Sequence, residues 1–173
     1  MHNTRRLVAA AISLAILVIC SQITIPIPTV PLTLQTLAVG FIAVFLPIID
    51  GLLVIIVYLI LGTLGLPIFA GLHGGLSYLL APAGGYLFGF IAFVLITKLF
   101  LRGKSQFNLW LALLLGDLSQ LICGTAGLQL ALHQSWPIVV GIGILPYIIP
   151  ELIKITLLTV IAQRLLPIWQ RKW

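Results

Sequence analysis

Charged side chains are nearly absent from this chain: only 7% of its 173 residues are charged, and only three are acidic. A soluble globular domain typically carries about 25% charged residues. The same chain is 61% hydrophobic. This composition excludes a soluble domain and indicates an integral membrane protein. It leaves no room for a soluble nucleotide-binding domain, and no P-loop pattern is present.

Cysteine and other reactive side chains are equally scarce. Cys20 and Cys123 lie in or beside apolar segments, so we interpret them as free buried thiols rather than a disulfide framework or metal cluster. The three histidines, His2, His73 and His133, lack the spacing of a metal site. No nucleophile–base pair and no paired catalytic carboxylates are visible. We therefore predict a protein that is not an enzyme and holds neither metal nor cofactor.

The sequence does contain long apolar runs, and these predict six transmembrane helices. The expected spans cover approximately residues 7–23, 33–46, 52–62, 86–101, 108–123 and 150–166. The first span follows M-H-N-T-R-R with no cleavage site, so we expect it to be retained. The prediction is one all-α membrane domain over residues 1–173.

Prolines and glycines interrupt the helices at four places. The run T-I-P-I-P-T-V-P over residues 24–31 cannot continue a helix, because each proline lacks an N–H donor. Pro47 with Asp50-Gly51 predicts a tight turn. Residues 65–85 form a Gly-rich connection, and residues 124–147 predict a second irregular region, although 128–132 can extend the fifth helix.

The net charge of +6 is distributed at the ends of apolar runs, which lipid explains better than nucleic acid. With six spans, both termini and the 2–3 and 4–5 connections share one side. Eight of the nine basic residues fall there: Arg5, Arg6, Lys98, Arg102, Lys104, Arg164, Arg171 and Lys172. The positive-inside rule predicts that this side is cytoplasmic.

The opposite, external side receives the three irregular connections, which are unusually apolar. Non-helical backbone is tolerated at membrane depth only when it is buried in protein or lines a cavity. We therefore expect these loops to fold over the helix ends and to roof a ligand pocket that opens outward.

The ninth basic residue, Lys154, lies three residues after Glu151, early in the last span and near the external surface. Side chains at i and i+3 share a helix face. An ionised group in hydrocarbon costs roughly 2.5–3.5 kcal/mol on insertion scales unless something compensates it. Two interpretations are about equally open: a self-contained ion pair, or a polar binding site that offers an acceptor and a cation together.

Other polar residues in the spans are weaker candidates for the site. Asp117 and Gln120 form a second i, i+3 pair, and an interhelical hydrogen bond is as good an interpretation as a site role. Gln35 is similar, near the external end of the second span. Tyr86 and Tyr147 have hydroxyls that could reach a pocket, although interfacial tyrosines commonly serve as membrane anchors.

Two small-residue patterns complete the candidates. Gly74 and Gly75, beside His73, allow the backbone to approach a ligand or to adopt positive φ. On the first span, Ala11 and Ala15 form a small-x-x-x-small stripe, which serves internal packing or docking on a partner membrane protein.

Several segments together resemble the BioY family, the biotin-specific substrate-binding (S) components of energy-coupling factor (ECF) transporters. The resemblance rests on V-P-L-T-L-Q-T-L-A-V (30–39), V-Y-L-I-L-G-T-L-G-L-P-I-F-A-G (57–71), G-G-L…L-A-P-A-G-G-Y-L-F-G-F (74–90) and L-P-Y-I-I-P-E-L-I-K (145–154). They occur in order and cover most of the chain.

The resemblance implies a six-helix protein of the bacterial cytoplasmic membrane that captures biotin from outside. It implies as partners a transmembrane coupling protein and two cytoplasmic ATPases, with Ala11 and Ala15 on the docking surface. Glu151 is then expected to accept from the ureido N–H groups of biotin. Lys154 is expected to meet either the ureido carbonyl or the ligand carboxylate, and the sequence does not decide which.

Two rival functions remain open at this stage. One is an S component for another vitamin, such as thiamine or riboflavin. The other is a membrane assembly subunit that binds no small ligand.

Overall fold

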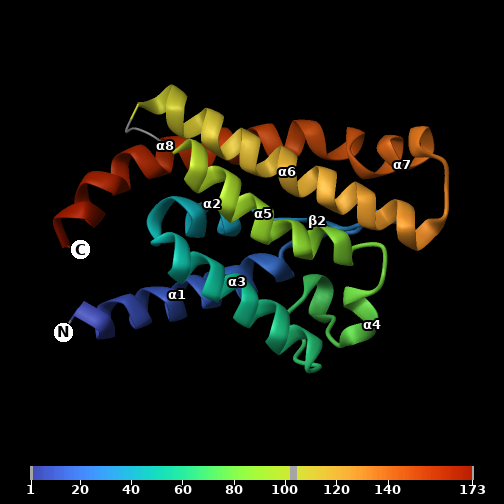
Figure 1. Ribbon diagram of the computed structural model, residues 1–173, viewed down its shortest axis with the longest axis horizontal. Coiled ribbons are helices and arrows are strands. Elements are labelled where there is room, and N and C mark those ends of the chain that lie inside the picture. Colours follow the sequence, from blue (N-terminus) through green and yellow to red (C-terminus); the bar gives the residue numbers. More distant parts are fainter. Residues whose placement is uncertain (1, 102–104, 173) are drawn as a thin grey trace.

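The computed structural model describes residues 2–101 and 105–172 and shows an all-α bundle with one small hairpin (Figure 1). Arg102 and Lys104, two of the residues used to predict the orientation, lie outside the described residues. The elements in chain order are α1 (His2–Gln22), β1 (Thr24–Ile25), β2 (Leu32–Thr33), α2 (Gln35–Phe45), α3 (Ile48–Thr63), the 3₁₀ turn η1 (Ala70–Leu72), α4 (Leu76–Leu79), α5 (Gly84–Phe100), α6 (Gln106–Leu132), α7 (Trp136–Gly143) and α8 (Leu145–Lys172).

The six main helices differ in their ability to cross a bilayer. In the described chain, α1, α6 and the α7–α8 segment are long and apolar enough to do so, whereas α2, α3 and α5 are shorter apolar helices. The 11 residues of α2 make a helix about 16 Å long, roughly half of a 30 Å hydrocarbon core. The predicted all-α membrane fold is confirmed, with the second span shortened.

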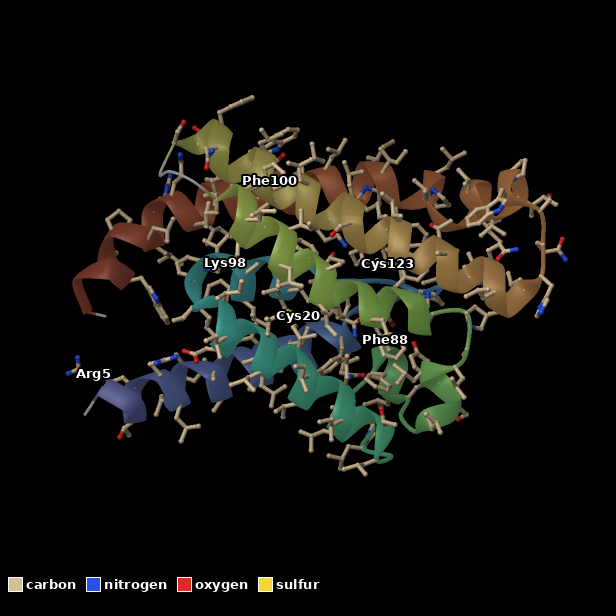
Figure 2. All side chains as sticks on the ribbon, viewed as in Figure 1. Arg5, Cys20, Phe88, Lys98, Phe100 and Cys123 are labelled. Carbon is tan, nitrogen blue, oxygen red and sulfur yellow. The ribbon has the colours of Figure 1, made fainter. Side chains whose placement is uncertain are left out.

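Both termini lie at one end of the bundle, while α4 and α7 lie at the other (Figure 1). Arg5 and Lys98 lie in the half that holds the termini, and Phe88 and Cys123 lie in the opposite half (Figure 2). This arrangement agrees with an even number of spans. We call the end with the termini the inner end and the opposite end the outer end.

The outer connections contain more regular structure than the sequence predicted. The proline-rich run forms an antiparallel hairpin in which Thr24 pairs with Thr33. The expected irregular region 124–147 is wrong, because α6 continues to Leu132 and α7 follows. Gly124 and Gly127 serve close packing and do not break the chain: a Cβ on Gly127 would lie 2.6 Å from the Cα of Gly85 on α5. Gly89 of α5 also lies close to α6, because a Cβ on it would lie 2.9 Å from the Gln120 carbonyl oxygen.

The predicted tight turn at Asp50 is also wrong. Pro47 precedes α3 with φ −53°, and Asp50 already lies in the first helical turn. Arg6 of α1 donates to both Asp50 carboxylate oxygens, Nε at 2.8 Å and Nη2 at 2.7 Å. Asp50 therefore joins α1 to α3 at the inner end.

Candidate ligand-binding site

A cavity lies between the hairpin, α2, α5, α6 and α8, beneath the α3–α4 connection. About 470 Å³ within it is not filled by protein atoms, a figure that includes its open mouth. Its wall is mostly apolar. The lining residues are Val30, Pro31, Leu32, Thr33, Gln35, Thr36, Ala70, Tyr78, Ala83, Tyr86, Leu87, Phe90, Gln120, Leu121, Tyr147 and Glu151.

The charged part of this wall is built by α2 and α8. The Lys154 ammonium donates to Glu151 Oε1 at 2.5 Å, to Thr36 Oγ1 at 2.6 Å and to the Thr33 carbonyl at 3.0 Å. An ammonium has three N–H donors, so this set uses all of them. The Glu151 and Lys154 side chains are only 6% and 9% exposed. The pair is thus deeply buried, and β2 and α2 supply its other partners.

Glu151 lines the cavity, whereas Lys154 does not. Thr36 Oγ1 donates to Glu151 Oε2 at 2.8 Å, so each carboxylate oxygen accepts one bond within the cluster. A carboxylate offers about four acceptor positions, so these two bonds do not use its full capacity. The arrangement provides a held, charged acceptor in a largely apolar wall.

Asp117 and Gln120 of α6 lie beside this cluster and are buried, with 2% and 3% exposure. Gln120 lines the main cavity, and its Oε1 has no hydrogen-bond partner within the described chain. Asp117 lies off that wall, in a smaller space of about 190 Å³ that also touches Thr36, Glu151 and Lys154. Its Oδ1 is likewise unpartnered among the described residues.

Gln35 connects the cavity wall to the roof. Its Nε2 donates to Tyr58 Oη at 2.6 Å, and Tyr58 Oη donates to the Ile68 carbonyl at 3.0 Å. The same carbonyl accepts from Ser21 Oγ at 2.7 Å. Gln22 bonds to η1, because its Oε1 accepts from the Leu72 N–H at 2.8 Å. The α3–α4 connection is thus tied to both α1 and α3.

Tyr86 and Tyr147 line the cavity, but their hydroxyls are not free to meet a ligand. Tyr86 Oη donates to the Gly143 carbonyl at 2.8 Å, and Tyr147 Oη donates to the Val30 carbonyl. Both hydroxyl protons are therefore used on backbone carbonyls. The ring centroids lie 6.1 Å apart and form one apolar side of the cavity.

His73, Gly74 and Gly75 lie in the roof connection and do not line the cavity. The exposed His73 ring stacks on Tyr78 and bonds the Ala70 carbonyl at 2.8 Å. Gly75 has φ +92°, and a Cβ on Gly74 would lie 2.3 Å from the Leu66 carbonyl oxygen. The two glycines shape the roof, and contact of these three residues with a ligand stays a prediction.

Ala11 and Ala15 are both exposed on α1. Ala11 lines an apolar groove between α1 and α3, about 1,010 Å³ with its open side included. Ala15 lies one turn further along the same helix face. The stripe therefore faces outward from the bundle and does not pack inside it.

Sequence reasoning missed Thr33, Thr36 and Tyr58. The two threonines bond a lysine more than 115 residues away, a pairing that depends on tertiary packing. Thr33 contributes its main-chain carbonyl, which any residue would supply, so its side chain carried no signal. Tyr58 gave no signal, because an isolated tyrosine in a span resembles any core aromatic.

Comparison with known proteins places these features in one family. The BioY family profile matches residues 1–171. "Biotin transporter BioY2" of Lactococcus lactis subsp. cremoris is 34% identical over 96% of this chain and 93% of its own length. "Biotin transporter BioY" of Thermotoga maritima is 35% identical over 93% and 95%, respectively.

Among solved structures, the fold is similar to the crystal structure of the S-component for biotin from an ECF-type ABC transporter. The TM-score is 0.87 over 95% of this chain and 92% of that one, with 24% sequence identity. This likeness supports the membrane architecture described above.

Proposed function

Because this chain belongs to the BioY family, we propose that it captures biotin outside the cell and carries it across the bacterial cytoplasmic membrane as the S component of an ECF transporter. The family consists of transport proteins, so the chain is not an enzyme. The names of its relatives and the likeness to a biotin S-component support this function. Biotin is the transported ligand, and ATP is used by partner subunits.

The single observation that carries the proposal is the Glu151 carboxylate, held by Lys154 and Thr36 on the wall of an otherwise apolar cavity. Biotin has a ureido group with two N–H donors. Each free acceptor position on Glu151 suits such a donor, and a charge-assisted bond is about twice as strong as a neutral one. A buried site of this kind rejects analogues that lack the matching group, because its own polar atoms are then left unpaired.

Gln120 and the aromatic side of the cavity complete the proposed fit. The unpartnered Gln120 Oε1 is a second acceptor for a ureido N–H. Phe90, with the Tyr86 and Tyr147 rings, suits the apolar thioether ring and tail. Lys154 does not line the cavity and its donors are occupied, so its proposed role is to hold and neutralise Glu151. The ligand carboxylate is then best solvated at the cavity mouth.

The same function requires partners and an orientation. We place the inner end, with both termini, in the cytoplasm, because basic residues gather there. The exposed Ala11–Ala15 face is proposed to dock on the transmembrane coupling protein, which associates with two cytoplasmic ATPases. Small side chains permit the close helix contact that such docking needs.

The test is titration of the purified full chain with biotin, followed by calorimetry and by melting temperature. A ligand at 100 times its Kd stabilises a protein by about 2.7 kcal/mol, so the expected shift is easily measured. Thiamine and riboflavin serve as competitors. Stabilisation by either of them instead of biotin would support the other-vitamin alternative, and no response to any vitamin would support the assembly-subunit alternative.

A further inference from the structure

The polar cluster contains one more acid than base. Two carboxyls, Asp117 and Glu151, share the smaller cavity with one ammonium, Lys154. The remaining lining of that cavity carries no charge: it comprises Thr36 and Leu37 of α2, Phe93 of α5, Leu113 of α6, and Ile155 and Leu158 of α8. With all three groups ionised, this buried site would hold an unbalanced negative charge.

Lys154 has no donor left for Asp117. Its three N–H bonds go to Glu151, Thr36 and the Thr33 carbonyl. Asp117 is 2% exposed, and its Oδ1 has no partner among the described residues. A buried carboxylate without a cation or a donor is strongly disfavoured.

The two carboxyls also lie close together, since Asp117 and Glu151 line the same small cavity. Two adjacent carboxylates cannot both remain ionised when only one cation serves them, and such pairs hold a single proton between them. A protonated Asp117 has an O–H to donate to the ionised Glu151, which leaves the Lys154 bond intact.

We propose that Asp117 and Glu151 share one proton beneath the ligand cavity, and that biotin binds tightly only while this proton is present. Loss of the proton leaves two carboxylates competing for one ammonium. This competition displaces Lys154 and Glu151, the proposed ligand acceptor, from the positions in which they support biotin binding. The linkage to biotin rests on the proposed function, whereas the shared proton does not.

The proton is tested without ligand by infrared spectroscopy of the purified full chain. We expect a protonated carboxyl C=O band at neutral pH that shifts in D₂O and disappears in Asp117→Asn. Asp50→Asn is the matched control, because the Asp50 carboxylate is bonded to Arg6 at the inner end, away from the cluster. Absence of the band in the wild type, or its persistence in Asp117→Asn, would overturn the proposal.

The linkage is tested by biotin titration between pH 6 and 9.5, where the ligand carboxyl is already ionised. Binding that requires one proton weakens towards about tenfold per pH unit above the pH at which the infrared band is lost. We expect this slope in the wild type and in Asp50→Asn, and a flat profile in Asp117→Asn. The amide preserves the size of the side chain and its ability to donate to Glu151.

The outcomes separate the two proposals. A flat wild-type profile, or a slope that persists in Asp117→Asn, would overturn the linkage. If biotin fails to bind at every pH while the infrared band behaves as expected, the shared proton stands and the biotin function falls.

Discussion

The two ends of this molecule each carry a pair of opposite charges, but the two pairs are built differently. At the inner end, Arg6 donates to both oxygens of Asp50 and joins α1 to α3, with the arginine side chain 40% exposed. At the outer end, Glu151 and Lys154 belong to one helix and are less than 10% exposed. A third ionisable group, Asp117, and two cavities lie beside them.

The difference separates an interhelical link from the proposed binding site. The inner pair satisfies itself and holds two helices together, with the Arg6 side chain 40% and the Asp50 side chain 13% exposed. The outer pair is buried at considerable desolvation cost, recruits neighbours from α2, and keeps acceptor positions facing a cavity. A pair that only neutralised two charges would need neither the cavity nor the surplus acid.

The largest effect is expected from breaking the outer pair. Lys154→Met leaves Glu151 buried without its cation, which costs about 3–5 kcal/mol, and biotin affinity should fall by at least about 100-fold. Calorimetric titration measures the affinity, and thermal melting measures the loss of stability.

The double variant Glu151→Leu/Lys154→Met separates binding from folding. Replacing both buried charges with apolar groups often restores stability. We expect recovered melting temperature with binding still lost. Biotin binding by the double variant would remove the pair from the site.

The next largest effect concerns the exposed face of α1. Ala11→Trp should abolish uptake that depends on the coupling protein, because a bulky ring prevents close helix approach. Biotin binding by the isolated chain should stay near the wild-type value, since Ala11 does not line the ligand cavity. Ile122→Trp, on the exposed part of α6, is the control. Equal uptake by both variants would contradict the proposed docking face.

A smaller effect should follow from loosening the roof. Tyr58→Phe removes the donor to the Ile68 carbonyl and the acceptor for Gln35. Leaving buried polar groups unpaired costs about 1–3 kcal/mol, so affinity should fall roughly tenfold. The loss should appear mainly as faster biotin dissociation, measured by stopped-flow competition. Ser21→Ala, which removes a different donor to the same carbonyl, should give a weaker change in the same direction.

The smallest effect on binding is expected at the inner pair. Asp50→Asn removes the charge that Arg6 binds, so melting temperature should fall slightly. Biotin affinity should stay within about twofold of wild type, because exposed pairs contribute little and this one is far from the cavity. A large loss of affinity would show that the two ends are coupled, and the contrast between them would fail.

The sequence predicted most of the fold where hydrophobic length and proline decide the structure. It failed at Gly124 and Gly127, because a glycine that breaks a soluble helix permits close packing between membrane helices. The prediction failed at Asp50 because helix starts and tight turns favour the same residue types. Glu151 and Lys154 were found because charges in hydrocarbon are conspicuous, whereas Thr36 and Tyr58 became visible only when the fold brought their partners together.

The shortness of α2 has a consequence for translocation. Thr36 is the second residue of a helix about 16 Å long, and that helix ends just before Pro47, where α3 begins at the inner end. A ligand held at Thr36 and Glu151 is therefore separated from the inner end by little more than the length of α2. On the proposed function, the energised partner has to open only that distance to release the ligand into the cytoplasm.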